Sequence, residues 1–163
     1  MEPNTTGRDT AQVAASPRRT SQGQEHKLNV FLSYGHDATQ PLAERLRDDL
    51  ERHGCSVWFD RADISPGSDW EIAIEKGLES VAAEPGKGVV ILLMTPHSVR
   101  RPDGYCLNEV TLAVTRRLKI LPIMLVDVQP PLSITRTQWL DMRDCVPLDS
   151  HEGSYEKKFR VLL

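Results

Sequence analysis

Hydrophobic and polar positions follow two different periods along most of the chain. Short β-rich or continuous apolar runs occupy residues 28–34, 55–60, 88–94 and 119–126, and the third of these, GVVILLM, contains no polar side chain. Runs of this length predict β-strands, and a strand that is apolar throughout is typical of a sheet covered on both faces. A shorter run, QWLDM at residues 138–142, predicts a fifth strand.

Helical spacing fills the segments between these runs. Leucines recur at every fourth position within residues 38–53, which predicts an amphipathic helix that ends at Gly54. Residues 69–82 are more apolar on one side and predict a second helix, and residues 153–163 predict the start of a final helix. Pro122 weakens the prediction of the fourth strand, because proline cannot donate a ladder hydrogen bond.

Strands that alternate with helices at these lengths predict right-handed βαβ units and an α/β fold, with one parallel sheet between two helical layers. In the five-stranded flavodoxin-like order 2-1-3-4-5, a ligand binds beyond the carboxyl ends of the strands, where the first and third strands meet. Three loops leave this edge of the predicted sheet, at residues 33–38, 60–70 and 95–109. They hold most of the polar, glycine and proline residues of the folded region, so we expect the functional site there.

The composition is that of an ordinary folded domain with a polar extension. The chain has 163 residues, of which 39% are hydrophobic and 26% charged, enough for one domain with a substantial core. Residues 1–26 have few large apolar side chains and predict a disordered tail before a folded domain at residues 27–163. The helical pattern continues to the final residues, KKFRVLL, without a helix-ending signal, so we expect a fragment of a longer multidomain protein.

Charge and cysteine content argue against several classes of protein. The formal net charge is −3, so no global basic field attracts nucleic acid or an anionic membrane. The three cysteines, Cys55, Cys106 and Cys145, form no CxxC pair, which argues against a disulfide framework or a zinc site and favours a reducing compartment. The apolar runs are too short to cross a bilayer, and no secretory signal opens the chain. These features predict a cytoplasmic protein without a metal site or a membrane span.

One carboxylate stands out in the stretch PDGYCLNEVTLAV at residues 102–114. On a helical wheel, Glu109 falls just outside an apolar arc, beside Tyr105. The arc is formed by Cys106, Leu107, Val110, Ala113, Val114 and Leu118. If Asp103 caps the helix, Glu109 lies beyond the first turn. The helix dipole stabilises a negative charge only within that turn, so it would not explain Glu109. Two interpretations remain: a boundary glutamate that reaches water or a basic side chain, and a catalytic carboxylate.

Other residues that often carry chemistry fit structural roles here. Cys106 lies on the apolar arc without an identified base, so we expect it in the core. We expect His53 and His97 on the surface, and Trp58 and Trp139 in core and sheet packing. The sequence contains no GxGxxG or GxxxxGK[ST] motif, which argues against a Rossmann dehydrogenase and a P-loop nucleotidase.

Three motifs lie on the loops of the predicted functional edge: VFLSYGHDA at residues 30–38, DRADISPGSDW at 60–70 and MTPHSVRRPDGYCLNE at 94–109. Together they resemble the first box, the second box with its BB loop, and the aromatic-Cys-x-x-Glu segment of a TIR (Toll/interleukin-1 receptor) domain. The resemblance extends from Lys27 to Leu163, and its more specific parts are the second box and the aromatic-Cys-x-x-Glu spacing. It implies a flavodoxin-like fold, in agreement with the pattern of strands and helices.

The resemblance also implies an activity. Many bacterial and plant TIR domains cleave the nicotinamide–ribose bond of NAD+, and the glutamate at the position of Glu109 is their catalytic residue. Nicotinamide leaves as a neutral molecule, so one carboxylate can stabilise the oxocarbenium-like ribose without a general acid. NAD+ is then a substrate and no cofactor is expected. The product is ADP-ribose, a cyclic variant of it, or the result of base exchange.

Further roles follow from the same resemblance. The expected substrate-binding residues are Tyr34, Gly35, His36, Asp37 and Tyr105, the last of which stands where the family usually has tryptophan. The residues of the second box that we expect to contact a neighbouring protomer are Arg61, Ile64, Pro66, Gly67 and Trp70.

The expected partners are NAD+, other TIR domains in a homo-oligomer or filament, and a sensor module elsewhere in the full-length chain. The family resemblance places such an activity in immune or antiphage defence signalling. A rival hypothesis is a non-enzymatic module that signals only by binding other TIR domains. A sequence that lacked the glutamate would favour this rival, and the present sequence retains Glu109.

Overall fold

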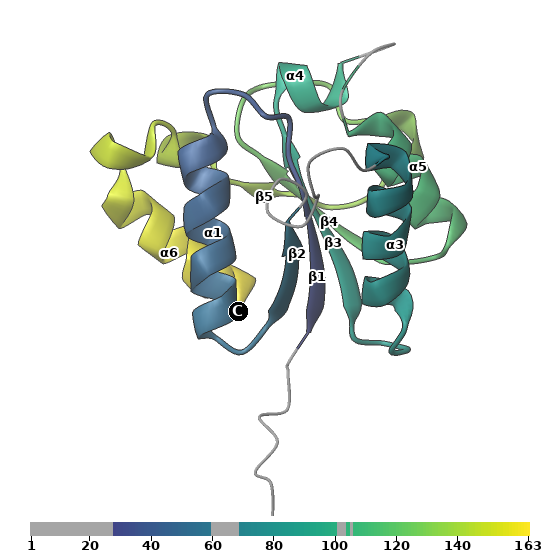
Figure 1. Cartoon of the computed structure of the whole chain (residues 1–163). Coiled ribbons are helices and arrows are strands. Elements are labelled where there is room, and N and C mark those ends of the chain that lie inside the picture. Colours follow the sequence, from purple (N-terminus) through teal and green to yellow (C-terminus); the bar gives the residue numbers. More distant parts are fainter. Residues whose placement is uncertain (1–27, 60–68, 101–103, 105) are drawn as a thin grey trace, which may run out of the picture.

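Five parallel strands form the centre of the molecule in the computed structural model, which describes residues 28–59, 69–100, 104 and 106–163. The strands are β1 (Asn29–Ser33), β2 (Ser56–Phe59), β3 (Gly88–Met94), β4 (Lys119–Met124) and β5 (Leu140–Asp141). They pair in the order β2-β1-β3-β4-β5, and every pair is parallel (Figure 1). The predicted flavodoxin-like sheet is confirmed.

Helices cover both faces of this sheet, as predicted (Figure 1). One face carries α1 (Gln40–Arg52) and α6 (Glu152–Leu162), and the other carries α3 (Trp70–Ala82) and α5 (Leu107–Thr115). The short helix α4 (Pro96–Val99) follows the carboxyl end of β3. Three 3-10 helices lie in the last third of the chain: η1 (Leu132–Ile134), η2 (Arg143–Cys145) and η3 (Leu148–Ser150). Among the described residues, no helix is both long and apolar enough to cross a bilayer.

The side chains of β1 alternate between the two helical layers. Val30 and Leu32 belong to the core cluster that includes α1 and α6, whereas Phe31 belongs to the cluster of α3 and α5. Because successive side chains of a strand point to opposite faces, Ser33 shares the α3 and α5 side with Phe31. A hydroxyl therefore enters the side of the sheet on which Phe31 packs in an apolar cluster with α3 and α5.

Burial of the central strand β3 supplies much of the driving force for this arrangement. Its residues from Val89 to Met94 are all buried. Each aliphatic side chain of this size contributes roughly 1.5–3 kcal/mol when it is removed from water. The continuous apolar run of the sequence is thus explained by helices on both faces of the strand.

Local signals set several boundaries. The Asp69 carboxylate accepts a hydrogen bond of 3.0 Å from the Glu71 N–H and caps α3. After α1, Gly54 adopts φ +85°, which glycine tolerates best, so the helix ends where the sequence predicts.

Pro122 lies inside β4 as a buried residue, and β5 pairs only with Ile123 and Met124, the two residues that follow this proline. On the side of β5, Pro122 therefore has no ladder partner, and a missing N–H is tolerated at such a position.

The aromatic and histidine predictions have mixed outcomes. Trp58 stacks on Phe31 with ring centroids 4.5 Å apart, and His53 and His97 are exposed, as predicted. Trp139 is 41% exposed, so its predicted place in the packing is wrong. It lies immediately before β5, which has only two residues and stands at the edge of the sheet.

Candidate functional site

Glu109 is a buried carboxylate in the first turn of α5. Its side chain is 2% exposed, and Oε2 accepts a hydrogen bond from the hydroxyl of Ser33 at the end of β1. Removing a carboxylate from water is costly unless polar partners replace the solvent. The Ser33 hydroxyl is such a partner, and it comes from a strand that is 76 positions away in the sequence.

The buried side of α5 is not the side that the hydrophobic pattern predicts. Cys106, Glu109, Val110 and Ala113 are buried, whereas Val114 is 41% exposed. At 100° per residue, the buried side is rotated toward Glu109 relative to the apolar arc of the sequence. The predicted boundary position of Glu109 and the predicted burial of Val114 are therefore both wrong, because the helix docks with its carboxylate toward β1. Cys106 lies in the core, as predicted.

The start of α5 also differs from the prediction, which placed the cap at Asp103, outside the described residues. Cys106 occupies the cap position, and its N–H donates to the Ser98 carbonyl at 2.8 Å. Cys106 is thus held against α4 directly before the helix begins at Leu107. Glu109 consequently lies in the first turn, where the helix dipole favours a negative charge by roughly 0.3–1 kcal/mol.

A groove between α3 and α5 reaches Glu109. Its volume is about 280 Å³, and it is lined by Glu71, Ile74, Glu75, Asn108, Glu109 and Leu112. Glu71 and Glu75 are exposed residues of α3, and Arg116, the residue that follows α5, pairs with Glu75 at 3.1 Å. The groove combines apolar surface from Ile74 and Leu112 with carboxylates on both of its helices. Such a mixture suits a ligand with a flat apolar part and a positive charge.

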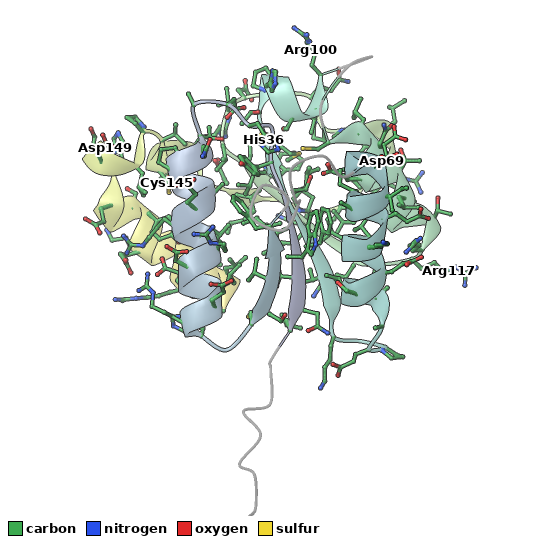
Figure 2. The ribbon with its side chains drawn as sticks, viewed as in Figure 1. His36, Asp69, Arg100, Arg117, Cys145 and Asp149 are labelled. Atoms are coloured by element: carbon green, nitrogen blue, oxygen red, sulfur yellow. The ribbon has the colours of Figure 1, made fainter. Side chains whose placement is uncertain are left out.

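The loop after β1 holds four of the predicted substrate-binding residues. Tyr34 is fully buried, and its ring stacks on Phe59 with a centroid distance of 4.9 Å. His36 has φ +53°, which is uncommon for a residue other than glycine, and its ring centroid lies 4.3 Å from that of Tyr34. A Cβ on Gly35 would meet the Ser98 nitrogen at 2.9 Å, so the loop approaches α4 as closely as glycine allows. Figure 2 shows His36 at the carboxyl edge of the sheet.

Asp37, the fourth residue, takes part in a hydrogen-bond network between the carboxyl ends of β1 and β3. Its Oδ1 accepts hydrogen bonds from the Thr39 N–H at 2.9 Å and the Thr39 hydroxyl at 2.6 Å, and its Oδ2 accepts one from the Thr95 hydroxyl at 2.5 Å. Partial burial acts to raise the pKa of Asp37, but these hydrogen bonds outweigh it and hold the pKa below its ordinary value. A charged carboxylate is thus fixed between the ends of β1 and β3.

Several predicted site residues cannot be placed in this geometry. Tyr105 and the second-box residues Arg61, Ile64, Pro66 and Gly67 lie outside the described residues. Trp70 is the first residue of α3, one of the two helices that line the groove. The predicted substrate-binding and assembly roles of these residues stay predictions.

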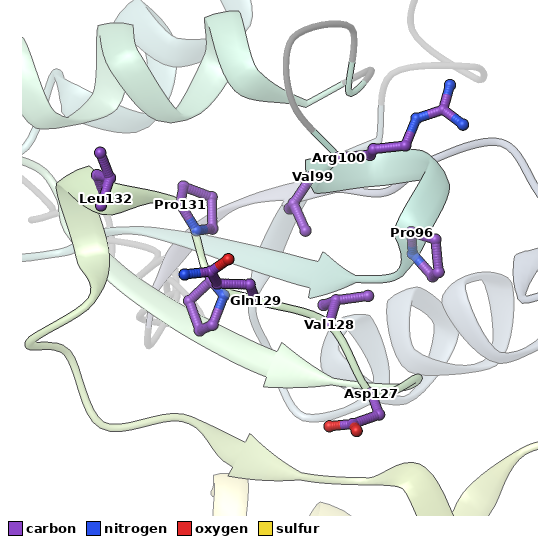
Figure 3. A pocket seen from close by; sticks show the side chains of 9 residues that line it. Pro96, Val99, Arg100, Asp127, Val128, Gln129, Pro131 and Leu132 are labelled. Atoms are coloured by element: carbon purple, nitrogen blue, oxygen red, sulfur yellow. The ribbon is translucent and has the colours of Figure 1, made fainter.

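A second cavity at the same edge was not anticipated from the sequence. It has a volume of about 600 Å³ and lies between α4 and the segment after β4 (Figure 3). Its lining is formed by Pro96, Val99, Arg100 and the residues 127–132. Figure 3 shows the Arg100 guanidinium directed away from the other labelled side chains. Glu109 is not among its lining residues, so this cavity is separate from the groove between α3 and α5.

The hydroxyls that organise this edge were not predicted from the sequence. Ser33 donates to Glu109, Thr95 donates to Asp37, and Ser98 donates to the Leu93 carbonyl at 2.8 Å. The available signal was the position of Ser33 and Thr95 at the ends of two apolar strands. Within the described part of the chain, no group of three or more His, Cys, Asp or Glu side chains is arranged to hold a metal ion.

Comparison with known proteins adds a family to this geometry. The family model described as TIR domain matches residues 30–160. The TIR domain of the Toll-related receptor TRR-2 from Hydra magnipapillata superposes with a TM-score of 0.59 at 20% identity, over 80% of this chain and 94% of that chain. The TIR domains of the activated Roq1 resistosome, which directly recognizes the pathogen effector XopQ, superpose with a TM-score of 0.55 at 14% identity, over 83% and 99%. No curated protein matches the sequence.

At these identities the two solved structures establish a shared fold. The family match is independent of them and spans the domain from β1 into α6. The five-stranded parallel sheet agrees with the fold shared with these TIR domains. This chain belongs to the TIR domain family.

Proposed function

We propose that this TIR domain hydrolyses the nicotinamide–ribose bond of NAD+, with Glu109 as the catalytic residue. The observation that supports this most directly is the buried Glu109 carboxylate, held by Ser33 at the end of β1 and reached by the groove between α3 and α5. A buried polar group next to a groove is a typical candidate for chemistry.

The proposed reaction requires little proton transfer by the protein. The pyridinium leaves as neutral nicotinamide, so the positive charge moves to the ribose in an oxocarbenium-like transition state. A fixed carboxylate stabilises that charge without reorganising during the reaction, which is a large source of rate acceleration in enzymes. Partial exclusion of water strengthens the interaction further, because the local dielectric constant is lower than that of water.

The size of the groove indicates which part of the substrate it takes. Its volume of about 280 Å³ lies just below the range of roughly 300–1,000 Å³ for pockets that enclose a whole small ligand. The nicotinamide end carries the only positive charge of NAD+ and suits the carboxylates of Glu71, Glu75 and Glu109. The negatively charged pyrophosphate then extends away from this acidic groove.

Activation through association of several TIR domains is part of the proposal. The similarity to the TIR domains of an activated resistosome supports it, because those domains belong to an assembled state. A sensor module elsewhere in the full-length protein would supply the trigger. We place this activity in the cytoplasm and in defence signalling.

The experiment is product analysis after NAD+ is incubated with the chain at high protein concentration. Chromatography of the products distinguishes ADP-ribose from a cyclic variant and from base exchange. Nicotinamide release is expected for the wild type and for Glu79→Gln, an exposed glutamate of α3 that does not line the groove. Loss of at least about a hundredfold in Glu109→Gln is expected, as for removal of a major electrostatic group. Equal activity in Glu109→Gln would disprove the assignment.

One observation favours a second candidate function. Glu109 is only 2% exposed and already engages Ser33, which is also what a purely structural carboxylate would do. A TIR domain without turnover would act as an interaction module that binds other TIR domains. Self-association in light scattering together with unchanged NAD+ at all protein concentrations would support this candidate.

A further inference from the structure

The contact between Ser33 and Glu109 joins the central part of the sheet to the helix of the candidate site. Both residues are almost completely buried, with exposed fractions of 1% and 2%. Alanine or valine would fill the place of Ser33 on a strand without desolvating a hydroxyl. The hydroxyl is used instead to donate a hydrogen bond to Glu109 Oε2.

We infer that Ser33 is a positioning residue, whose hydroxyl fixes the orientation of the Glu109 carboxylate and keeps it charged for the reaction. This inference rests on the proposed function, because it concerns the residue to which that function assigns the chemistry. Ser33 itself does not touch the reacting atoms in this scheme.

The backbone around Ser33 is fixed on both sides. Ser33 pairs with Leu92 of β3 in the parallel register, and β1 lies between β2 and β3. Two residues later, Gly35 packs against the nitrogen of Ser98 at a distance that excludes a larger side chain. A donor on a strand held in this way can impose a geometry on a carboxylate, because the strand itself does not yield.

The other hydroxyls at this edge have different targets. Thr95 donates to Asp37 and accepts from the Ser98 N–H, as the cap of α4. Ser98 donates to the Leu93 and Thr95 carbonyls. The bonds of Ser98 complete a helix cap and a turn, and the bond from Thr95 to Asp37 joins the loop after β1 to α4. The Ser33 hydroxyl instead reaches a carboxylate on a helix of the groove, which separates its role from theirs.

Acidic side chains from both helices line the groove at Glu109. Glu71 and Glu75 of α3 line the same groove, and carboxylates at short range oppose one another's ionisation. Arg116 offsets part of this effect, since its guanidinium lies 3.1 Å from Glu75 and 3.2 Å from Glu79. The Ser33 hydroxyl and the first turn of α5 then favour the charged form of Glu109 from the side of the sheet.

The test combines a titration that needs no activity with steady-state kinetics. Carbon-13 NMR of labelled glutamate carboxyl groups follows Glu109 with pH, and Glu109→Gln identifies its signal. Ser33→Ala removes the donor, Ser33→Thr restores a hydroxyl on a residue that strands accept, and Thr111→Ala is the matched control. Thr111 is an exposed residue of α5 whose hydroxyl donates to the Leu107 carbonyl at 2.8 Å. Circular dichroism verifies folding, and Ser33→Cys, whose thiol is only a weak donor, replaces Ser33→Ala if that variant fails to fold.

In Ser33→Ala, the titration midpoint of Glu109 is expected to move to higher pH, because the charged form loses a donor. The kcat for NAD+ cleavage is expected to fall by about tenfold while KM stays within about twofold, with recovery in Ser33→Thr. Thr111→Ala is expected to match the wild type in both measurements. An unchanged midpoint in Ser33→Ala would overturn the inference at any level of activity. A wild-type chain that does not consume NAD+ would instead remove the proposed function, and the titration would still decide whether Ser33 controls the carboxylate.

Discussion

The hydroxyl of Thr95 donates a hydrogen bond of 2.5 Å to Asp37 Oδ2 and ties the loop after β1 to the end of β3. The two residues are 58 positions apart and meet because β1 and β3 are neighbours in the sheet. This is the switch point of a doubly wound sheet, where the loops diverge and ligands bind. The contact therefore stabilises the edge on which the proposed site depends.

Thr95→Val is expected to lower the free energy of unfolding by about 1–3 kcal/mol. The substitution removes the donor to Asp37 and the side-chain cap of α4, and it leaves a partly buried carboxylate with one partner fewer. Urea denaturation at pH 7 measures the change. Thr95→Ser keeps the hydroxyl and is expected to stay within about 0.5 kcal/mol of the wild type. Equal losses in both variants would show that the methyl group matters rather than the hydrogen bond.

Asp49 and Tyr155 are expected to be energetically coupled. The Tyr155 hydroxyl donates to Asp49 Oδ2 at 2.8 Å, which joins α1 to α6, and Arg45 donates to the same oxygen at 2.8 Å. Burial and the neighbouring Asp49 raise the pKa of Tyr155, so it remains a protonated donor. A double-mutant cycle with Asp49→Asn and Tyr155→Phe is expected to give a coupling energy of about 1–2 kcal/mol. Additive losses within about 0.3 kcal/mol would contradict the coupling.

Acid is expected to destabilise the fold below about pH 4. Burial acts to raise the pKa of Asp49, but Tyr155, Arg45 and Arg52 hold it below its ordinary value of 3.8. A carboxylate whose pKa is lower in the folded state stabilises fully above its unfolded pKa, and this contribution disappears as the pH falls through the folded pKa. Urea denaturation between pH 6 and pH 2 measures the dependence. Asp49→Asn is expected to be less stable at pH 6 and to lose less stability on acidification than the wild type.

Gly77→Ala is expected to destabilise the packing of α3 on the sheet by about 1–3 kcal/mol. A Cβ at this position would lie 2.4 Å from the Trp58 indole, which is itself stacked on Phe31. The control is Gly153→Ala in α6, where a Cβ would meet no atom within 4 Å. That variant is expected to be neutral or slightly stabilising, since alanine has the higher helix propensity. Thermal unfolding of both variants compares them, and similar melting temperatures would contradict the close packing of Gly77.

Glu109→Gln is expected to leave stability unchanged or to raise it by up to about 1 kcal/mol. The amide keeps the shape of the side chain and can still accept a hydrogen bond from Ser33. The free-energy cost of burying a charged carboxylate is removed. Residues kept for chemistry often show this gain, because functional sites are not optimised for stability. Guanidinium denaturation measures the difference. A loss above about 3 kcal/mol would assign Glu109 a structural role instead.

Much of the fold could be predicted because its signals are local. The apolar run of β3 and the leucine spacing of α1 each specify an element through a pattern of few residues. Alternation of the two element types then leaves few ways to arrange a parallel sheet. Strand β4 formed despite Pro122, since burial and a short neighbouring strand outweighed the loss of one donor.

The candidate site could be predicted only in part. The sequence pointed to Glu109 and to the loop from Tyr34 to Asp37, because polar residues at the carboxyl ends of apolar strands are a local signal. It did not anticipate that Glu109 is fully buried, nor that Ser33 is its partner. The hydrophobic pattern of α5 placed the carboxylate at a margin, and the docking of the helix on β1 rotated it inward.

The sequence by itself determined the strands, the helices and their parallel arrangement, since each depends on periodic burial that the order of residues encodes. Only the tertiary structure decided which polar groups meet. Ser33 contacts Glu109 and Thr95 contacts Asp37 because β1 and β3 are adjacent in the sheet and α5 packs on their side. Such pairs are separated by many tens of residues, and no local pattern specifies them. The physical reason is that a buried polar group needs a partner, and the fold alone determines which partner lies within reach.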